Sequence, residues 1–281
     1  MRERAQGETS RHIGADMEAG IVARIDDRLA RVAREHGVTI PLAIESGSRA
    51  WGFPSPDSDY DCRFIYVRPL DHYLALHPHR DVIETPLDAV FDVNGWDLAK
   101  ALRLMLRGNA VVVEWLTSPL VYGADTAFRT EFLDLAGRAA ERSLAMRHYL
   151  HLGERNRRTY LADPADVPLK KLFYALRPAV MLRWLRLNPT RAHGPMDLPT
   201  LVAETDVPAN VGAEIVELLA RKAETRELGR AALPDAIARL LDSEFDWARE
   251  ASRVAPPAAR EAARREADAF FRATVRRFDG T

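Results

Sequence analysis

The first long pattern in the chain is that of an amphipathic helix. From Ala15 to about Glu35, apolar side chains recur at intervals of three and four positions, and Gly37 follows the run. This period places the apolar side chains on one face of a helix. They belong to Ile21, Ile25, Leu29 and Val32. Residues 1–14 are polar and contain no apolar core segment, so we expect a flexible leader there rather than a signal peptide.

Shorter apolar runs follow the helix, and they predict β-strands. The runs are Val38–Ile44, Tyr60–Val67, Val82–Thr85 and Ala89–Val93. Pro41 lacks a backbone N–H, so it favours a sheet edge or a bulge in the first strand. A loop rich in Gly, Ser and Pro is expected over residues 45–58. Helical patterns resume from Trp96 to Gly108 and, less regularly, over Asn109–Leu116.

After Pro119 the pattern is helical to the end of the chain, and we expect no strand there. The helical segments are 126–162, 168–187, 209–228, 233–253 and 257–277. Pro178 should kink its helix, because a proline ring removes a backbone hydrogen bond. The prediction is an α+β protein in which a mixed-sheet domain over 15–122 precedes a helical bundle over 123–281.

Composition narrows the class of protein. Of the 281 residues, 47% are hydrophobic, and 40 Lys plus Arg nearly balance 41 Asp plus Glu. The net charge of −1 gives no general attraction to nucleic acid or to a membrane. Cys62 is the single cysteine, so no intrachain disulfide can form, which suits the reducing cytoplasm. No apolar run approaches the roughly 18 residues that span a bilayer.

Acidic residues cluster where the second predicted strand begins. Asp59 and Asp61 flank Tyr60, and the two-residue period of a strand places both carboxylates on one face. Two carboxylates this close repel each other unless a cation lies between them. Such oxygen ligands suit Mg²⁺ or Mn²⁺, which bind carboxylates together with substrate phosphates. Asp57 shares the phase but lies in the loop after Pro56, and we interpret it as a turn residue.

A turn that could hold phosphate lies just upstream. Gly47-Ser48 follows the first strand, where glycine allows a tight turn and the serine can donate to a phosphate oxygen. Arg49 could contact phosphate or form a surface salt bridge. Arg63 shares the face of the two aspartates, so it could contact phosphate or pair with a carboxylate.

The spacing of these residues resembles a known signature. Gly47-Ser48, a gap of ten residues and Asp59-Tyr60-Asp61 resemble the motif of the DNA polymerase beta superfamily of nucleotidyltransferases. The longer run ESGSRAWGFPSPDSDYDCRFIYVRP, together with residues 92–122 and 169–178, resembles one branch of it, the RlaP-like, RNA-repair-associated family. The resemblance implies a nucleotidyltransferase domain with a mixed sheet, followed by helices.

The same resemblance implies a role for each part of the motif. The glycine–serine turn would bind the triphosphate of a nucleotide, and Asp59 and Asp61 would hold the divalent metal, Mg²⁺ or Mn²⁺. The superfamily places a third carboxylate on a later strand. Asp92 is our choice because it lies on a predicted strand, and Asp88 is the alternative.

A basic run in the second half supplies further candidates. Residues 169–178 (LKKLFYALRP) lie on a predicted helix, where side chains three and four positions apart share a face. The candidates are Lys170, Lys171, Tyr174 and Arg177. A solvated basic face is the usual role of such a run, and the resemblance favours contact with a triphosphate or an acceptor. Trp51 and Phe53 could stack on a base or pack onto the core.

The function implied is transfer of a nucleoside monophosphate from an NTP to a hydroxyl, with release of pyrophosphate. The family name suggests an RNA end as the acceptor, and a protein acceptor (AMPylation) or a small molecule stays open. The second hypothesis is a non-catalytic sensor of nucleotide or RNA on the same fold.

Overall fold

The computed structural model describes residues 8–77, 79–252 and 257–279. Within them, a six-stranded mixed sheet has the order β1-β6-β2-β3-β5-β4. The strands are β1 Thr9–His12, β2 Thr39–Glu45, β3 Tyr60–Val67, β4 Val82–Glu84, β5 Phe91–Asp97 and β6 Val121–Asp125. Neighbouring strands in this sheet are antiparallel except for β3 and β5, which run parallel.

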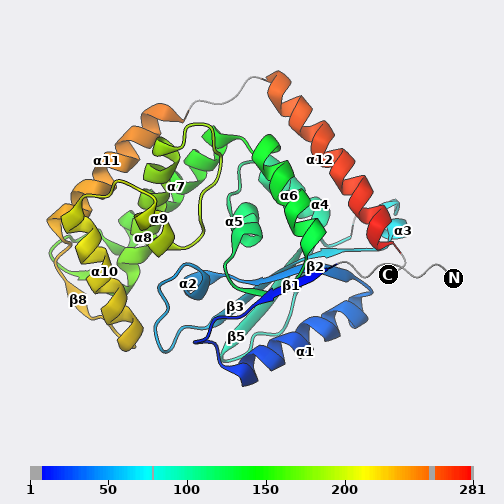
Figure 1. The fold of residues 1–281 in the computed structure, drawn as a ribbon, viewed down its shortest axis with the longest axis horizontal. Coiled ribbons are helices and arrows are strands. Elements are labelled where there is room, and N and C mark those ends of the chain that lie inside the picture. The colour runs from blue at the N-terminus through cyan, green and yellow to red at the C-terminus, as the bar shows by residue number, and fades with distance from the viewer. Residues whose placement is uncertain (1–7, 78, 253–256, 280–281) are drawn as a thin grey trace.

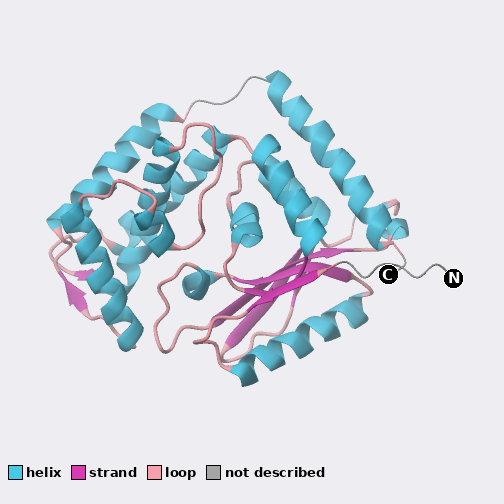
Figure 2. Cartoon of the chain, viewed as in Figure 1, coloured by secondary structure: helices cyan, strands magenta, loops and turns pink. Residues whose placement is uncertain are grey.

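Helices cover both faces of the sheet (Figure 1; Figure 2). One face packs against α1, Ala19–His36. The other face packs against α4 Leu98–Leu106, α5 Val111–Thr117, α6 Thr126–Ala139 and α12 Pro257–Phe278. The side chains of β3 alternate between the two cores, as the period of a strand requires. Phe64 and Tyr66 lie on the α1 side, whereas Ile65 and Val67 lie on the other.

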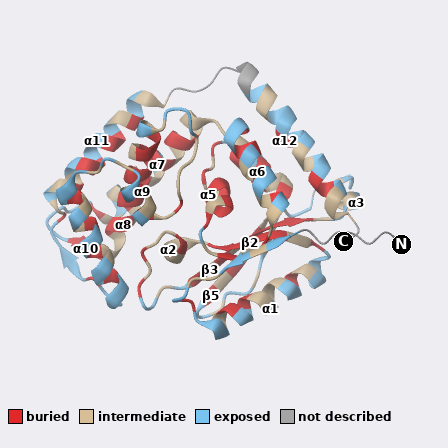
Figure 3. Ribbon diagram, viewed as in Figure 1, coloured by how far each residue is buried: buried red, intermediate tan, exposed pale blue. Residues whose placement is uncertain are grey.

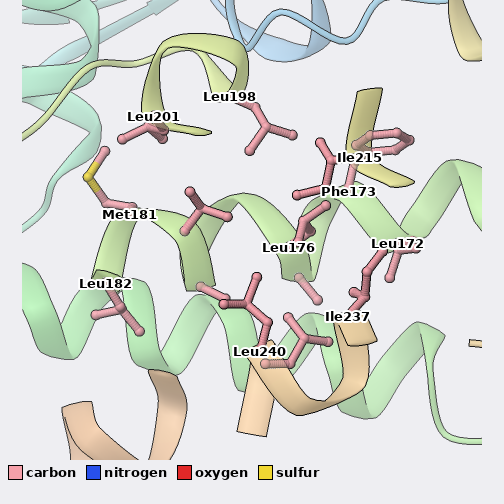
Figure 4. Packing of buried hydrophobic residues seen from close by; sticks show 14 of the residues in the cluster. Leu172, Phe173, Leu176, Met181, Leu182, Leu198, Leu201, Ile215, Ile237 and Leu240 are labelled. Atoms are coloured by element: carbon pink, nitrogen blue, oxygen red, sulfur yellow. The ribbon is translucent and has the colours of Figure 1, made fainter. Parts of the chain in front are cut away.

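A second core lies among the helices beside the sheet (Figure 1). These helices are α7 Arg142–Tyr160, α8 Leu169–Leu187, α9 Leu198–Ala203, α10 Ala209–Glu224 and α11 Asp235–Ala251. Leu172, Leu176 and Leu182 of α8 contribute to the centre of this core (Figure 4). The residues of α8 are buried on several sides of the helix (Figure 3), which is typical of a central helix. No helix in the described part of the chain is long and apolar enough to cross a membrane.

Three short elements complete the fold. The α2 helix, Gly47–Ala50, links β2 to the loop before β3, and α3, Leu70–Tyr73, follows β3. A small antiparallel ribbon of β7, Val167–Pro168, and β8, Arg230–Ala231, lies beside the start of α8.

The α+β class is confirmed, and two expectations near the sheet edge are wrong. The leader predicted over residues 1–14 is not flexible throughout, because Thr9–His12 form β1, which pairs with β6. Residues 1–7 lie outside the described residues. The expectation of no strand after Pro119 is wrong as well, since β6, β7 and β8 all follow it. These strands are short, and their residues carry no regular alternation.

Boundaries within the helical half also differ from the prediction. The segment 126–162 is two helices, α6 and α7, which meet at Ala140-Glu141. The short α9 was not predicted. The expected domain boundary at 122/123 falls inside β6, and α6 and α12, which follow it, pack on the sheet rather than with α7–α11.

Both prolines of interest are accommodated by their neighbours. Pro41 lies in an interior strand, and the shift in register between Thr39 and Leu42 provides the bulge that the sequence suggested. Pro178 lies inside α8, where its missing N–H leaves the carbonyl of Tyr174 without a helical donor. Asn156 of α7 donates its side-chain amide to that carbonyl at 2.9 Å.

The loop between α2 and β3 is anchored in the helical core. Phe53 is 2% exposed and stacks on Phe173 of α8, with ring centroids 5.1 Å apart. Lys222 of α10 donates to the carbonyl of Phe53, and Lys170 forms an ion pair with Asp57 at 3.2 Å. Of the two roles considered for Phe53, the structure shows packing onto the core.

Removal of the Phe53 ring should therefore destabilise the whole protein. We expect Phe53→Ala to lower the free energy of unfolding by about 3–5 kcal/mol, because the change leaves a cavity between the loop and α8. Chemical denaturation measures the change. Leu76→Ala is the control, since that side chain is 90% exposed and should cost little. Equal stability of the two variants would contradict the anchoring role.

Candidate active site

Two carboxylates lie side by side on neighbouring strands. The parallel register of β3 and β5 pairs Asp61 with Asp92. Tyr60 and Cys62, which flank Asp61, belong to the core on the α1 side, so Asp61 projects from the opposite face. The structure thus brings together two of the three predicted carboxylates, and Cys62 is a buried core residue as predicted.

A guanidinium group joins these two carboxylates. Nη2 of Arg63 donates to Oδ1 of Asp61 at 3.0 Å and to Oδ2 of Asp92 at 2.9 Å. The side-chain amide of Asn94 donates to both oxygens of Asp92, at 2.7 and 2.9 Å. Of the two alternatives for Arg63, the structure shows the pairing with carboxylates.

The remaining predicted carboxylates differ in their relation to this pair. Asp59 lies just before β3 and is exposed. The pKa of Asp61 is raised. Burial is the main cause and Asp92 and Asp59 add to it, whereas the guanidinium of Arg63 opposes the change. Asp59 is therefore close enough to influence the ionisation of Asp61. Asp88 instead pairs with Arg24 of α1 at 2.6 Å, so the geometry favours Asp92 as the third carboxylate.

Gly47 places the turn directly against the carboxylates. It begins α2 with a φ of 63°, a conformation that glycine adopts without strain. A Cβ atom at Gly47 would overlap Oδ2 of Asp61, so another residue here would displace the carboxylate. The N–H of Ser46 also donates to the carbonyl of Asp61 at 2.9 Å. The turn and the acidic strand therefore form one unit.

Ser48 and Arg49 brace the loop that leads to Asp59. Oγ of Ser48 donates to Oγ of Ser58 at 3.0 Å. Arg49 donates to the carbonyl of Ser58 at 2.8 Å, and its guanidinium lies 4.0 Å from the ring centre of Tyr60. In this structure both side chains hold the loop in place, with Arg49 largely buried.

Three of the four candidates on α8 lie near this site. Lys170 binds Asp57 in the loop, and Lys171 lies over the rings of Tyr160 and Tyr174, 5.5 and 5.1 Å from their centres. Burial raises the pKa of Tyr174, and Tyr160 and Asp61 raise it further. Tyr174 is thus near enough to Asp61 for that carboxylate to affect its pKa.

The fourth candidate on α8, Arg177, was predicted to contact the triphosphate or the acceptor, and the structure places it elsewhere. It is buried, with Nη2 2.8 Å from Oε1 of Glu114 and Nε 2.8 Å from the carbonyl of Met196. The hydroxyl of Tyr149 donates to the same carboxylate at 2.9 Å. Arg177 thus holds α8 to α5 and does not face the site. Helical spacing placed it on the basic face, whereas Glu114, distant in the sequence, draws it inward.

Glu45 is a site residue that the sequence did not single out. It is buried at the end of β2, where Oε1 accepts the N–H of Asp61 at 2.7 Å and Oε2 accepts the hydroxyl of Tyr122 at 2.5 Å. Burial raises its pKa to about 7, although both hydrogen bonds oppose this change. The available signal was an acid at the end of an apolar strand, directly before the Ser46-Gly47 turn.

Lys222 is a second such residue. Its side chain is buried, and burial lowers its pKa to about 8, with Lys170 adding to the effect. The signal lay in its spacing, because it continues the apolar stripe of α10. Ile215 and Leu218 belong to that stripe.

The family described as RlaP, RNA repair pathway DNA polymerase beta family, matches residues 21–273. The chain belongs to this family. A relative is "Uncharacterized protein YcgL" from Bacillus subtilis (strain 168), which is 39% identical over 230 residues. That alignment covers 82% of this chain and 87% of the relative. The family match extends over β2–β6 and over α7–α11, so it includes the carboxylates and the helices beside them.

Membership of a polymerase beta family raises the question of a divalent metal. Among residues 8–77, 79–252 and 257–279, no group of three His, Cys, Asp or Glu side chains is placed to hold one. The donors nevertheless suit such an ion. A single cation, the guanidinium of Arg63, already contacts both Asp61 and Asp92, and the exposed Asp59 lies nearby. Carboxylate oxygens are the ligands that Mg²⁺ and Mn²⁺ prefer, so these residues fit the ion in kind.

The pKa of Glu45 leads to a test of the site's electrostatics. A folded-state pKa near 7, above the ordinary value of 4.5, means that its contribution to stability is complete below pH 4.5 and is lost as the pH rises through 7. Glu45→Gln cannot ionise. We expect the stability of this variant relative to wild type to rise by about 3 kcal/mol from pH 4.5 to pH 8.

Urea unfolding at a series of pH values measures this difference. Glu84→Gln serves as the control, because Glu84 is exposed and pairs with Arg80 on the surface. A difference between Glu45→Gln and wild type that stays constant over this pH range would show that folding does not raise the pKa of Glu45.

Proposed function

We propose that this protein is a divalent-metal-dependent nucleotidyltransferase, which moves a nucleoside monophosphate from an NTP to a hydroxyl group and releases pyrophosphate. The contact between Gly47 and Asp61 carries the proposal. A turn suited to phosphate and a pair of carboxylates suited to metal are common features separately. Here the absence of a Cβ at Gly47 allows the two to touch, so that phosphate and metal would meet at one place.

Each part of the site has a role in this proposal. Gly47 and Ser48 form the first turn of α2, where backbone N–H groups lack helical acceptors and can donate to phosphate oxygens. Asp59, Asp61 and Asp92 would hold Mg²⁺ or Mn²⁺. When bound, such an ion neutralises charge on the phosphates and on the attacking oxygen.

The protein's own contribution is alignment. The strands fix Asp61 and Asp92 in register, and the loop anchored by Phe53 fixes the approach to Asp59. In this proposal Asp92 would also assist deprotonation of the acceptor hydroxyl. Alignment of this kind accounts for much of the rate gain in phosphoryl transfer.

The helical half would provide the contacts to the triphosphate and the acceptor. Lys170, Lys171 and Tyr174 lie beside the site and combine positive charge with aromatic rings. This combination suits a nucleotide or a nucleic-acid strand. We favour an RNA end as the acceptor, in agreement with the family's description, over a protein hydroxyl. The single buried cysteine is in keeping with activity in the cytoplasm.

A non-catalytic sensor of nucleotide or RNA is the alternative. It would need the turn and the lysines but not all three carboxylates. Retention of Asp59, Asp61 and Asp92 together therefore favours an enzyme. A sensor would be stabilised by nucleotide without turnover.

Transfer of labelled nucleotide tests the enzyme directly. Incubation with labelled NTPs, Mg²⁺ or Mn²⁺, and RNA, protein or small-molecule acceptors should give product. The double variant Asp59→Ala/Asp61→Ala and the single variant Asp92→Ala should each lose at least about 100-fold in rate, because they remove the metal ligands.

Asp88→Ala is the matched control for Asp92→Ala. It removes an aspartate from the same segment, one that pairs with Arg24 away from the site, and should retain near wild-type activity. Wild-type transfer no greater than that of the double variant, across every acceptor, would refute the enzymatic proposal.

The lysines of α8 can be tested in the same assay. We expect Lys171→Gln to raise the KM for the nucleotide by about 5- to 10-fold with little change in kcat, because it removes a contact made equally in ground and transition states. Lys100→Gln is the control, since Lys100 lies on α4 and pairs with Asp81, just before β4. An unchanged KM would exclude Lys171 from the nucleotide site.

A further inference from the structure

Arg63 lies between two of the carboxylates that the proposed function assigns to the metal. Its guanidinium donates to one oxygen of Asp61 and one oxygen of Asp92, at 3.0 and 2.9 Å. It also donates to the backbone carbonyls of Cys62 and Asp92, at 3.0 and 3.2 Å. These four contacts hold the group between the two strands.

This arrangement meets the demand for positive charge without a metal. Asp61 and Asp92 face each other in register, and two carboxylates in such a position need a cation. The side chains of Arg63, Asp61 and Asp92 are 21%, 33% and 25% exposed. Their charges are therefore partly shielded from water and interact more strongly than they would on the surface.

The same contacts engage one oxygen of each carboxylate. A ligand oxygen must direct a lone pair at the ion, and the oxygens that face each other across the two strands already accept N–H groups of Arg63. A metal ion that bridged Asp61 and Asp92 would therefore compete with the guanidinium for these oxygens.

We infer that Arg63 is a built-in competitor for the divalent cation and leaves the carboxylates when a nucleoside triphosphate binds. This inference rests on the proposed function. A guanidinium pairs readily with phosphate oxygens, often through two parallel hydrogen bonds. The triphosphate gives Arg63 a new partner, and the metal then takes its place between Asp61 and Asp92. Free metal binds weakly, and nucleotide and metal strengthen each other's binding reciprocally.

Binding of Mn²⁺ to the full-length protein, without nucleotide, is the first test. Electron paramagnetic resonance of free Mn²⁺ measures the affinity. We expect Arg63→Gln to bind Mn²⁺ at least about 10-fold more tightly than wild type. Arg103→Gln is the control. Arg103 lies on α4 and pairs with Asp81, so its removal should leave the affinity for Mn²⁺ unchanged.

A second variant separates displacement from a general effect of charge. Arg63→Lys keeps the positive charge, but an ammonium lacks the planar fork that joins the two carboxylates. If Arg63 must be displaced, Arg63→Lys also binds Mn²⁺ more tightly than wild type. If only net charge matters, it binds as wild type does, and the inference is overturned. Thermal unfolding of each variant confirms that it is folded.

The nucleotide arm of the experiment uses the α,β-methylene analogues of the four ribonucleoside triphosphates. In wild type, Mn²⁺ should raise the affinity for one of them strongly, and in Arg63→Gln this increase should shrink. Equal Mn²⁺ affinity of wild type and Arg63→Gln overturns the inference even when nucleotide transfer is intact. If Arg63→Gln binds Mn²⁺ more tightly than wild type but the wild type transfers no nucleotide, the proposed function is overturned instead.

Discussion

Two carboxylates in register on adjacent parallel strands repel each other, and a positive charge between them offsets this repulsion. Asp61 and Asp92 have this relation, and Arg63 provides the charge. The surrounding residues are consistent with the same requirement. Glu45, the buried acid behind Asp61, has a raised pKa, so at neutral pH it adds only part of a negative charge. Repulsion between the acidic side chains at the centre of the sheet is thus offset by the guanidinium of Arg63.

The loop from Trp51 to Asp57 ties this centre to the helices. Phe53 is buried in the helical core cluster and Trp51 packs against that cluster, although the loop lies between the turn of α2 and the acidic start of β3. Lys170 and Lys222 hold the loop from two different helices. The spacing between the Gly47-Ser48 turn and the aspartates is therefore set as much by α8 and α10 as by the sheet. A change in the packing of those helices would alter the site without touching it.

Local periodicity predicted the parts of the site that depend on one strand. The alternation of β3 placed Asp61 and Arg63 on the face opposite to Tyr60 and Cys62, and the structure agrees. The choice of Asp92 also agrees with the register, although periodicity could not establish that β3 and β5 are neighbours. Arg177 and Lys222 could not be placed from the sequence, because their partners, Glu114 and the carbonyl of Phe53, lie far away along the chain. Strands β1 and β6 were missed for the same reason, since each is defined mainly by its pairing.

The buried cluster of Glu114, Arg177 and Tyr149 determines how independent the two halves of the protein are. It spans α5, α7 and α8, and thus joins helices that belong to different hydrophobic cores. A buried ion pair is costly to break on one side, because the remaining charge has no partner. Exchange of the helical half for an unrelated bundle would leave Glu114 in that condition. The helical half therefore cannot be replaced as a separate module unless the new bundle supplies a partner for Glu114.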